Sequence, residues 1–421
     1  LTRMPLQLEL NSLRLIGLDA NDLQAHGTAK ADSILIGKGW ASLILAEAKN
    51  SLSDTTKIAQ QFLNSIQLNF FKADSLSFVL GLNPKNTKEQ FKTSLICEAS
   101  NILIPLQKDA PLAYSNLQLG LSDLYLLPRK SIAYYTLEKG HYNSMENSIE
   151  LNGFKMRQSI SELRYAKHFG WDKAFVKLDV FKIVIAGIPN KLAQLNDGIN
   201  VDKITLLGAQ AYFYKDKRLP HPNKPRPFPV EALSALKIPV HVREVLVTDG
   251  QLFYNENWRE DYVPGRLNLS DIDLVISNIS STGPTKQGKW TIVKGNILML
   301  DQLKLDVDWR FDLRTKGKSF TLDLGIGACT FESLNPFTEN TVGVHFKKGD
   351  LQGGRLLVSG DKTSGSGTLD LFYKSMKVEL LDKQTHHTGF VEWAGGGLAN
   401  LVVRNNNLKN KKPQQGIVYA E

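Results

Sequence analysis

The stretch Leu303–Arg314, LKLDVDWRFDLR, alternates apolar and charged residues without a break. The apolar residues of one parity are Leu303, Leu305, Val307, Trp309, Phe311 and Leu313. The charged residues of the other parity are Lys304, Asp306, Asp308, Arg310, Asp312 and Arg314. A period of two places these sets on opposite faces of a β-sheet. At about 3.3 Å per residue, the stretch predicts a strand roughly 40 Å long with one apolar and one wet face.

The same alternation continues outward from this strand. After the predicted turn Thr315–Lys318, the next segment carries Phe320, Leu322 and Leu324 in one phase. Further alternating segments are Leu6–Leu15, Asn64–Leu80, Gly265–Ser277 and Gly367–Leu381, the last with a change of parity at Leu371–Tyr373 that predicts a bulge. Strands with one polar face are typical of antiparallel sheets.

Helical signals are few and short. Ser53 or Asp54 can cap one helix, Ser161 and Gly170 can bound a second, and Pro229–Pro239 can form a third between prolines. None is long enough to build a helical domain. The sequence therefore predicts an all-β fold, a long twisted antiparallel sheet with a few short helices. The apolar side of such a sheet must be closed, paired with another sheet or bound to something apolar.

Composition limits the classes of protein and of site. The chain has 421 residues, of which 42% are apolar and 22% charged, with a net charge of +9. Its two cysteines, Cys97 and Cys329, have no neighbouring Cys or His at ligand spacing, so we expect no zinc site. No apolar run reaches the length of about 18 residues that a membrane-spanning helix needs.

Both ends of the chain look like strands in progress. The first residues, LTRMPLQLEL, already alternate, and the last, GIVYAE, also have strand character. We interpret the chain as a piece of a longer protein, cut from membrane-anchoring ends. Residues 1–160 are expected to form the N-terminal part of an elongated sheet, and residues 161–421 a C-terminal part with repeated β units that continues it.

One such unit occurs twice. Val242–Trp258 can be laid over Val201–Arg218 without a gap. Asp249 and Gly250 have the sequence of a two-residue type I′ turn. Each copy is therefore either a short hairpin or a strand with a kink, and units that bury little alone usually stack into an array. The Pro-rich, basic stretch Arg218–Pro229 after the first copy is either a solvated loop or a contact for a partner or for anionic headgroups.

No catalytic constellation can be found in the sequence. The one adjacent pair of histidines, His386 and His387, would point to opposite faces of a strand. The aspartates of Leu303–Arg314 share their face with arginines, as on an ordinary wet face. No glycine cluster fits a phosphate-binding loop. Aromatic residues follow the apolar phase, which disfavours nucleic-acid binding. We expect no catalytic residue, no metal, no cofactor and no nucleic-acid partner.

Four segments carry a resemblance to a known family: Ile199–Pro220, Ile238–Glu256, Gly265–Ser280 and Gly365–Leu381. In pattern and spacing, over about residues 180–381, the chain resembles the AsmA-like proteins of Gram-negative bacteria, Bacteroidota members in particular. TamB and YhdP are relatives in that family. The resemblance implies a β-sheet curled into a half-pipe with an apolar trough, and a bridge-like lipid transporter of the periplasm and cell envelope that has no catalytic residues.

The leading functional hypothesis is thus a non-enzymatic conduit for phospholipid-like molecules. Its partners would be lipid acyl chains and a membrane surface or membrane-anchored proteins. The expected lipid-facing residues are Leu305, Val307, Trp309, Phe311, Leu313, Phe320, Leu322 and Leu324. An alternative is a structural or assembly module that docks onto outer-membrane machinery. A hydrolase of envelope polymers would need an acid/base pair that the sequence does not offer.

Overall fold

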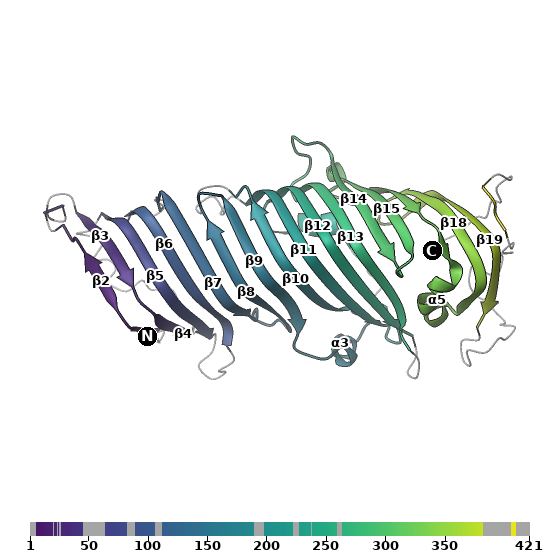
Figure 1. Cartoon of the computed structure of the whole chain (residues 1–421), viewed down its shortest axis with the longest axis horizontal. Helices are drawn as coiled ribbons and strands as arrows, with labels where there is room; N and C mark the ends of the chain where they lie inside the picture. Colours follow the sequence, from purple (N-terminus) through teal and green to yellow (C-terminus); the bar gives the residue numbers. More distant parts are fainter. Residues whose placement is uncertain are drawn as a thin grey trace. The chain divides into compact units, whose positions relative to one another are not determined.

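Strands make up most of the chain. The computed structural model describes residues 6–19, 21–22, 24, 27–44, 64–81, 89–105, 112–188, 198–221, 227–236, 238–258, 263–381 and 406–409. Of the residues so described, strands account for 68% and helices for 10%. The predicted all-β class is confirmed, with strands in curled sheets and a few short helices (Figure 1). The helix predicted after Ser53 lies outside the described residues.

The chain divides into two compact units. Unit 1 comprises residues 1–159 and 179–205, and unit 2 comprises residues 160–178 and 206–421. Strands β10 (Phe175–Ala186) and β11 (Ile199–Asp216) contribute residues to both units.

Unit 1 is a mixed sheet rather than a purely antiparallel one. Its strands are β1 (Leu6–Leu10), β2 (Leu13–Ile16), β3 (Thr28–Ile36), β4 (Gly39–Ile44), β5 (Ser65–Gly81), β6 (Glu89–Pro105), β7 (Asn116–Leu126), β8 (Ala133–Asn143) and β9 (Ser148–Gln158). From β5 to β9 each strand pairs antiparallel with the next. By contrast, β3 and β4 lie end to end along β5 and pair with it in parallel. The strand predicted over Leu6–Leu15 is likewise broken, since β1 pairs with β4 and β2 with β3.

Unit 2 contains the strand predicted over Leu303–Arg314. Its strands after β11 are β12 (Val240–Asn257), β13 (Gly265–Ser280), β14 (Trp290–Met299), β15 (Leu303–Asp312), β16 (Phe320–Ile326), β17 (Cys329–Thr330), β18 (Val344–Gly360) and β19 (Gly365–Leu380). Its helices are α3 (Glu162–Phe169), α4 (Pro229–Ser234) and α5 (Asn335–Val342), with 3₁₀ turns η2 (Leu313–Thr315) and η3 (Phe331–Leu334). From β12 to β16 each strand pairs antiparallel with the next, and β16, β18 and β19 continue the ladder.

The repeated unit is a kinked strand, so the hairpin prediction for Asp249–Gly250 is wrong and the kink prediction is right. Strand β12 runs through this position, and its pairing with β13 shifts register between Val247 and Leu252. Asp249 has φ 54°, and its backbone N–H donates to Asp273 Oδ1 at 3.1 Å. The aligned residue of the first copy, Gly208, has φ 58°. The left-handed residue belongs to a β-bulge because β13 continues to pair on both sides of it.

Three other local predictions can be compared with the structure. Strand β15 stops at Asp312, two residues earlier than predicted, because the Asp312 carboxylate accepts a hydrogen bond from the Arg314 backbone N–H at 2.9 Å. Leu313 therefore belongs to η2 rather than to the strand. Helix α3 begins after Ser161 and ends at Gly170, whose φ of 75° closes it as predicted. Strand β19 does contain a bulge, but it lies at Ser375, whose φ is 54°, and not at Leu371–Tyr373 as predicted; opposite Phe372 and Tyr373 the extra residue is Gln352 of β18.

Candidate functional site

One face of the unit 2 sheet gathers the apolar residues of several strands. Directly opposed residues of paired strands share a face, so the register carries the alternation of β15 onto its neighbours. Val307 lies opposite Gly295 on β14 and Leu324 on β16. Trp309 lies opposite Val293 and Leu322 in the same way. We call this side of the unit 2 sheet the apolar face.

Helix α4 covers one end of the apolar face. Phe311 and Leu313 are only 2% and 1% exposed, and they pack with Val230, which is 4% exposed. Phe228, just before α4, places its ring 5.2 Å from that of Phe320 and 6.1 Å from that of Phe311. These contacts make a closed aromatic cluster at this end.

The position of α4 is fixed by two further contacts. Glu231 forms an ion pair with Lys362. Gly317, with φ 75°, lies so close that a Cβ there would be 2.6 Å from Cβ of Val230. A glycine is required at 317 both by its backbone conformation and by the closeness of α4.

The turn η3 and helix α5 cover the other end. Phe331 of η3 packs with Leu303, Leu351 and Met376, all less than 9% exposed. Partly buried residues around this cluster include Leu305 and Ile326. A Cβ at Gly265 would lie 2.4 Å from Cγ2 of Thr341, so α5 is tightly seated on β13. The η3 cluster therefore covers the start of strand β15, and α4 covers its end.

A row of apolar residues remains between the covers. Cross-strand pairing links its members one after another: Val247, Leu274, Gly295, Val307, Leu324, Leu356 and Leu369. We call this set the apolar row. None of its side chains is fully buried, and Leu369 is 54% exposed. The row therefore runs across the strands and not along one of them. A ligand that lies across the sheet could contact its members one after another.

The opposite face of the same strands carries paired charges. Arg310 donates two hydrogen bonds to Asp308, at 2.7 and 2.8 Å, and Lys294 lies 3.2 Å from the same carboxylate. Arg355 makes a similar pair with Asp323. These hydrogen bonds lower the pKa of both carboxyl groups below the ordinary range.

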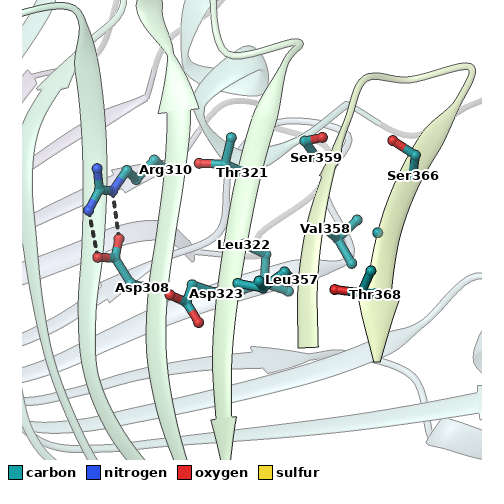
Figure 2. Close-up of a pocket in the computed structure, with 11 residues that line it drawn as sticks. Asp308, Arg310, Thr321, Leu322, Asp323, Leu357, Val358, Ser359, Ser366 and Thr368 are labelled. Atoms are coloured by element: carbon teal, nitrogen blue, oxygen red, sulfur yellow. Dashed lines mark hydrogen bonds and ion pairs between the residues drawn. The ribbon is translucent and has the colours of Figure 1, made fainter. Parts of the chain in front are cut away.

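A shallow depression of about 670 Å³ lies over these pairs, and Figure 2 shows Asp308, Arg310, Asp323 and Thr368 around it. Because the guanidinium groups already occupy both carboxylates, this face is the ordinary wet side of a sheet.

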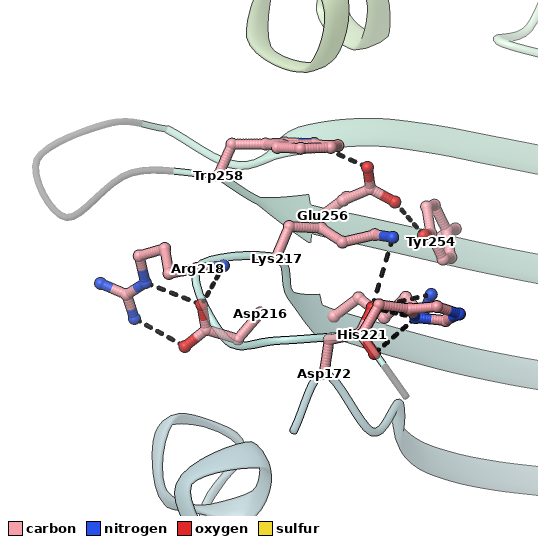
Figure 3. Close-up of polar contacts among 9 residues, drawn as sticks. Asp172, Asp216, Lys217, Arg218, His221, Tyr254, Glu256 and Trp258 are labelled. Atoms are coloured by element: carbon pink, nitrogen blue, oxygen red, sulfur yellow. Dashed lines mark hydrogen bonds and ion pairs between the residues drawn. The ribbon is translucent and has the colours of Figure 1, made fainter. Parts of the chain in front are cut away.

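A second polar cluster lies at the end of β11 (Figure 3). Asp172 is fully buried, with its carboxylate oxygens 2.9 and 3.0 Å from His221 Nδ1. The ammonium groups of Lys217 and Lys215 lie 3.3 and 3.5 Å away. Burial favours the neutral acid, but the hydrogen bond with His221 and the two lysine charges outweigh it and lower the pKa of Asp172.

Neighbouring polar groups are matched in the same manner. Arg218 donates to both oxygens of Asp216 at 2.7 Å, and Trp258 Nε1 donates to Glu256 at 2.6 Å. The sequence predicts a basic face of the Pro-rich stretch from Lys215, Lys217, Arg218, Lys224 and Arg226. The first three are paired with carboxylates, and Lys224 and Arg226 lie outside the described residues. We interpret this cluster as a set of structural ion pairs that hold the segment after α3 against the end of β11.

Other kinds of site can be assessed only for the described part of the chain. Within it, no three His, Cys, Asp or Glu side chains gather as metal ligands would. Its helices are all too short or too polar to cross a bilayer. Cys97 and Cys329 are free thiols whose pKa is raised, chiefly by burial.

The lipid-facing residues expected from sequence fall into three environments. Val307 and Leu324 lie in the apolar row, and Leu322 lies beside it. Leu305 packs against the η3 cluster. The expectation that Phe311 and Leu313 face lipid is corrected, because α4 covers them; Trp309 and Phe320 border the same cluster.

Sequence reasoning did not identify the remaining members of the row. Leu356 and Leu369 lie in segments whose alternation was visible, but their alignment with Val307 depends on register. One local feature could have indicated that Phe228 and Val230 cover other residues: they lie at the start of a short apolar segment between prolines.

Comparison of the sequence with protein-family models and with curated proteins gives no match.

Proposed function

We propose that the chain is a non-enzymatic lipid-binding protein whose apolar row holds acyl chains. The observation that carries the proposal is the contrast in exposure along one face. Helices cover both ends, yet the row from Val247 to Leu369 stays half-buried or exposed. Contiguous apolar surface that is only partly buried is typical of a binding site.

Acyl chains suit the row because it offers no polar anchor. Each CH₂ group removed from water contributes about 0.8 kcal/mol. A sixteen-carbon chain therefore gains roughly 10 kcal/mol before the cost of ordering it is subtracted. Such a ligand needs no specific hydrogen bond for affinity, which accounts for a site without a sequence signature.

The wider role follows from the resemblance to AsmA-like proteins. We propose that the chain carries phospholipid-like molecules along its sheet between membranes of the cell envelope of a Gram-negative bacterium. A membrane surface or membrane-anchored proteins would be its partners. Support comes from the all-β fold with a curled sheet and from an apolar row that crosses the strands, as passage along the sheet would require.

The competing proposal is a structural module whose row is covered by a partner protein of the outer-membrane machinery. Apolar side chains that are half-exposed fit a protein partner as well as a lipid. The two proposals differ in what the isolated chain carries, since a lipid-binding protein retains or takes up lipid without any partner.

Two adjacent residues of β19 provide a matched test. Leu369 is in the apolar row and Thr368 is on the opposite face, and both are exposed. We expect Leu369→Asp to lose most binding of a fluorescent phospholipid while Thr368→Asp retains it, with both variants melting like the parent. Mass spectrometry of the purified parent should find co-purified phospholipid. A parent that neither carries nor takes up lipid would refute the lipid proposal in favour of the structural module.

A further inference from the structure

The indole nitrogen of Trp309 is an unpaired donor in the middle of an apolar cluster. Among the described residues, Nε1 of Trp309 is the one buried side-chain N–H group without a hydrogen-bond partner. A buried tryptophan normally reaches an acceptor through this group. Buried amide oxygens of Gln90, Asn116 and Asn147 also have no hydrogen-bond partner, and these three residues belong to unit 1.

The neighbouring side chains of Trp309 are apolar and cannot accept a hydrogen bond from its N–H group. Its ring lies 4.6 Å from that of Phe311 and 6.3 Å from that of Phe320. Val293 and Leu322 flank it across the sheet. These neighbours are all apolar, so the packing of the ring does not use its N–H group.

The position of Trp309 relates the donor to the apolar row. Trp309 is two residues from Val307 on the same face, so it stands where the open row meets the cluster beneath α4. An acyl chain that occupies only the part of the row from Leu369 to Val307 ends next to this ring. The first polar atoms beyond the chain of an acyl-glycerol lipid are those of its ester group, whose carbonyl oxygen is a hydrogen-bond acceptor.

We infer that Trp309 Nε1 donates a hydrogen bond to the ester carbonyl of a bound acyl-glycerol lipid, so that the site prefers ester-linked over ether-linked chains. This inference rests on the proposed lipid-binding function and adds the chemical class of the ligand. Trp309 packs against the cluster of Val230, Phe311 and Leu313, to which Phe228 also belongs, so a lipid that reaches Nε1 must displace part of this cluster, and α4 with the preceding Phe228 is the segment that we expect to shift.

The test compares two phosphatidylcholines of equal chain length, one with ester and one with ether linkages. Binding of each is measured by calorimetry to the full chain and to Trp309→Phe. The parent should bind the ester lipid about fivefold more tightly than the ether lipid, as one net hydrogen bond provides. Trp309→Phe should bind both equally, at the level of the ether lipid.

Two further measurements keep the result interpretable. The lipid-free Trp309→Phe variant should still melt cooperatively and close to the parent, because removal of an unpaired buried donor offsets part of the packing that the smaller ring loses. Phe228→Ala should bind both lipids more tightly and keep the ester preference. A parent that binds both lipids equally, or a preference that survives in Trp309→Phe, overturns the inference and leaves the proposed function standing. A parent that binds neither lipid overturns both.

Discussion

Phe311 and Val307 stand on the same face of β15 and come from one uninterrupted alternation, yet their environments differ. Phe311 is 2% exposed beneath α4, whereas Val307 is only partly buried in the row between the covers. The difference teaches that an apolar phase identifies a face of the sheet but not what lies on it. A segment about eighty residues earlier, Phe228–Ser234, decides which part of that face is closed.

The largest effect is expected from a charge beneath the cover. Phe311→Asp buries a carboxylate without a cation partner, which costs several kcal/mol, a large part of the stability of an ordinary domain. We expect the variant to be insoluble or to melt far below the parent in thermal unfolding. Phe311→Leu, which keeps an apolar side chain, is the control and should fold. A soluble Phe311→Asp with parental melting would show that the α4 cluster is not closed.

A charge in the open row should act on binding more than on folding. Val307→Asp keeps access to water, so we expect a loss of about 1–2 kcal/mol in unfolding free energy. Bound phospholipid, measured by mass spectrometry, should fall at least tenfold, and Leu322→Asp should behave in the same direction. If Val307→Asp instead destabilises as strongly as Phe311→Asp, and the parent carries no lipid, the row is a closed core.

The packing of α4 against Gly317 can be tested with two glycines that have the same backbone conformation. Gly317 and Gly170 both have φ 75°, but only at Gly317 does an added Cβ meet α4. Gly317→Ala should destabilise unit 2 by about 1–2 kcal/mol and expose the α4 segment to protease. Gly170→Ala carries the backbone strain alone and should leave protease resistance of α4 unchanged. Equal digestion of the two variants would argue against the contact.

A smaller effect on stability is expected at the bulge in β12, where the two copies of the repeat carry different residues. Asp249 and Gly208 hold the same left-handed conformation, so Asp249→Gly should be tolerated. Asp249→Val places a β-branched residue there and should cost about 1 kcal/mol in denaturant unfolding. A valine variant as stable as the glycine variant would mean that the positive φ is not required.

The smallest effect concerns the ion pair of α4 and depends on pH. The hydrogen bond from Lys362 lowers the pKa of Glu231, so its contribution is present at neutral pH and is lost as pH falls through that lowered pKa. The melting temperature of the parent should exceed that of Lys362→Met slightly at pH 7, and the difference should vanish in acid. A difference that grows as pH falls would contradict this assignment.

Several features of the protein follow from the sequence by itself. The period of two in β15 and β16 defines their apolar and wet faces, because side-chain direction along a strand is a local property. Gly170 ends α3, and a change of parity marks a bulge in β19, although the bulge lies at Ser375 and not at Leu371–Tyr373. The alternation throughout the chain likewise predicts the all-β class that the structure confirms.

Other features were decided by tertiary structure. Asp249–Gly250 has the sequence of a turn, but pairing with β13 on both sides makes it a bulge. The parallel pairing of β3 and β4 with β5 joins segments that no local pattern connects. Above all, the burial of Phe311 by Val230 and the alignment of Val307 with Leu356 and Leu369 depend on contacts between distant segments. A local period can assign a residue to a face, whereas only register and long-range packing determine whether that face meets protein or remains open.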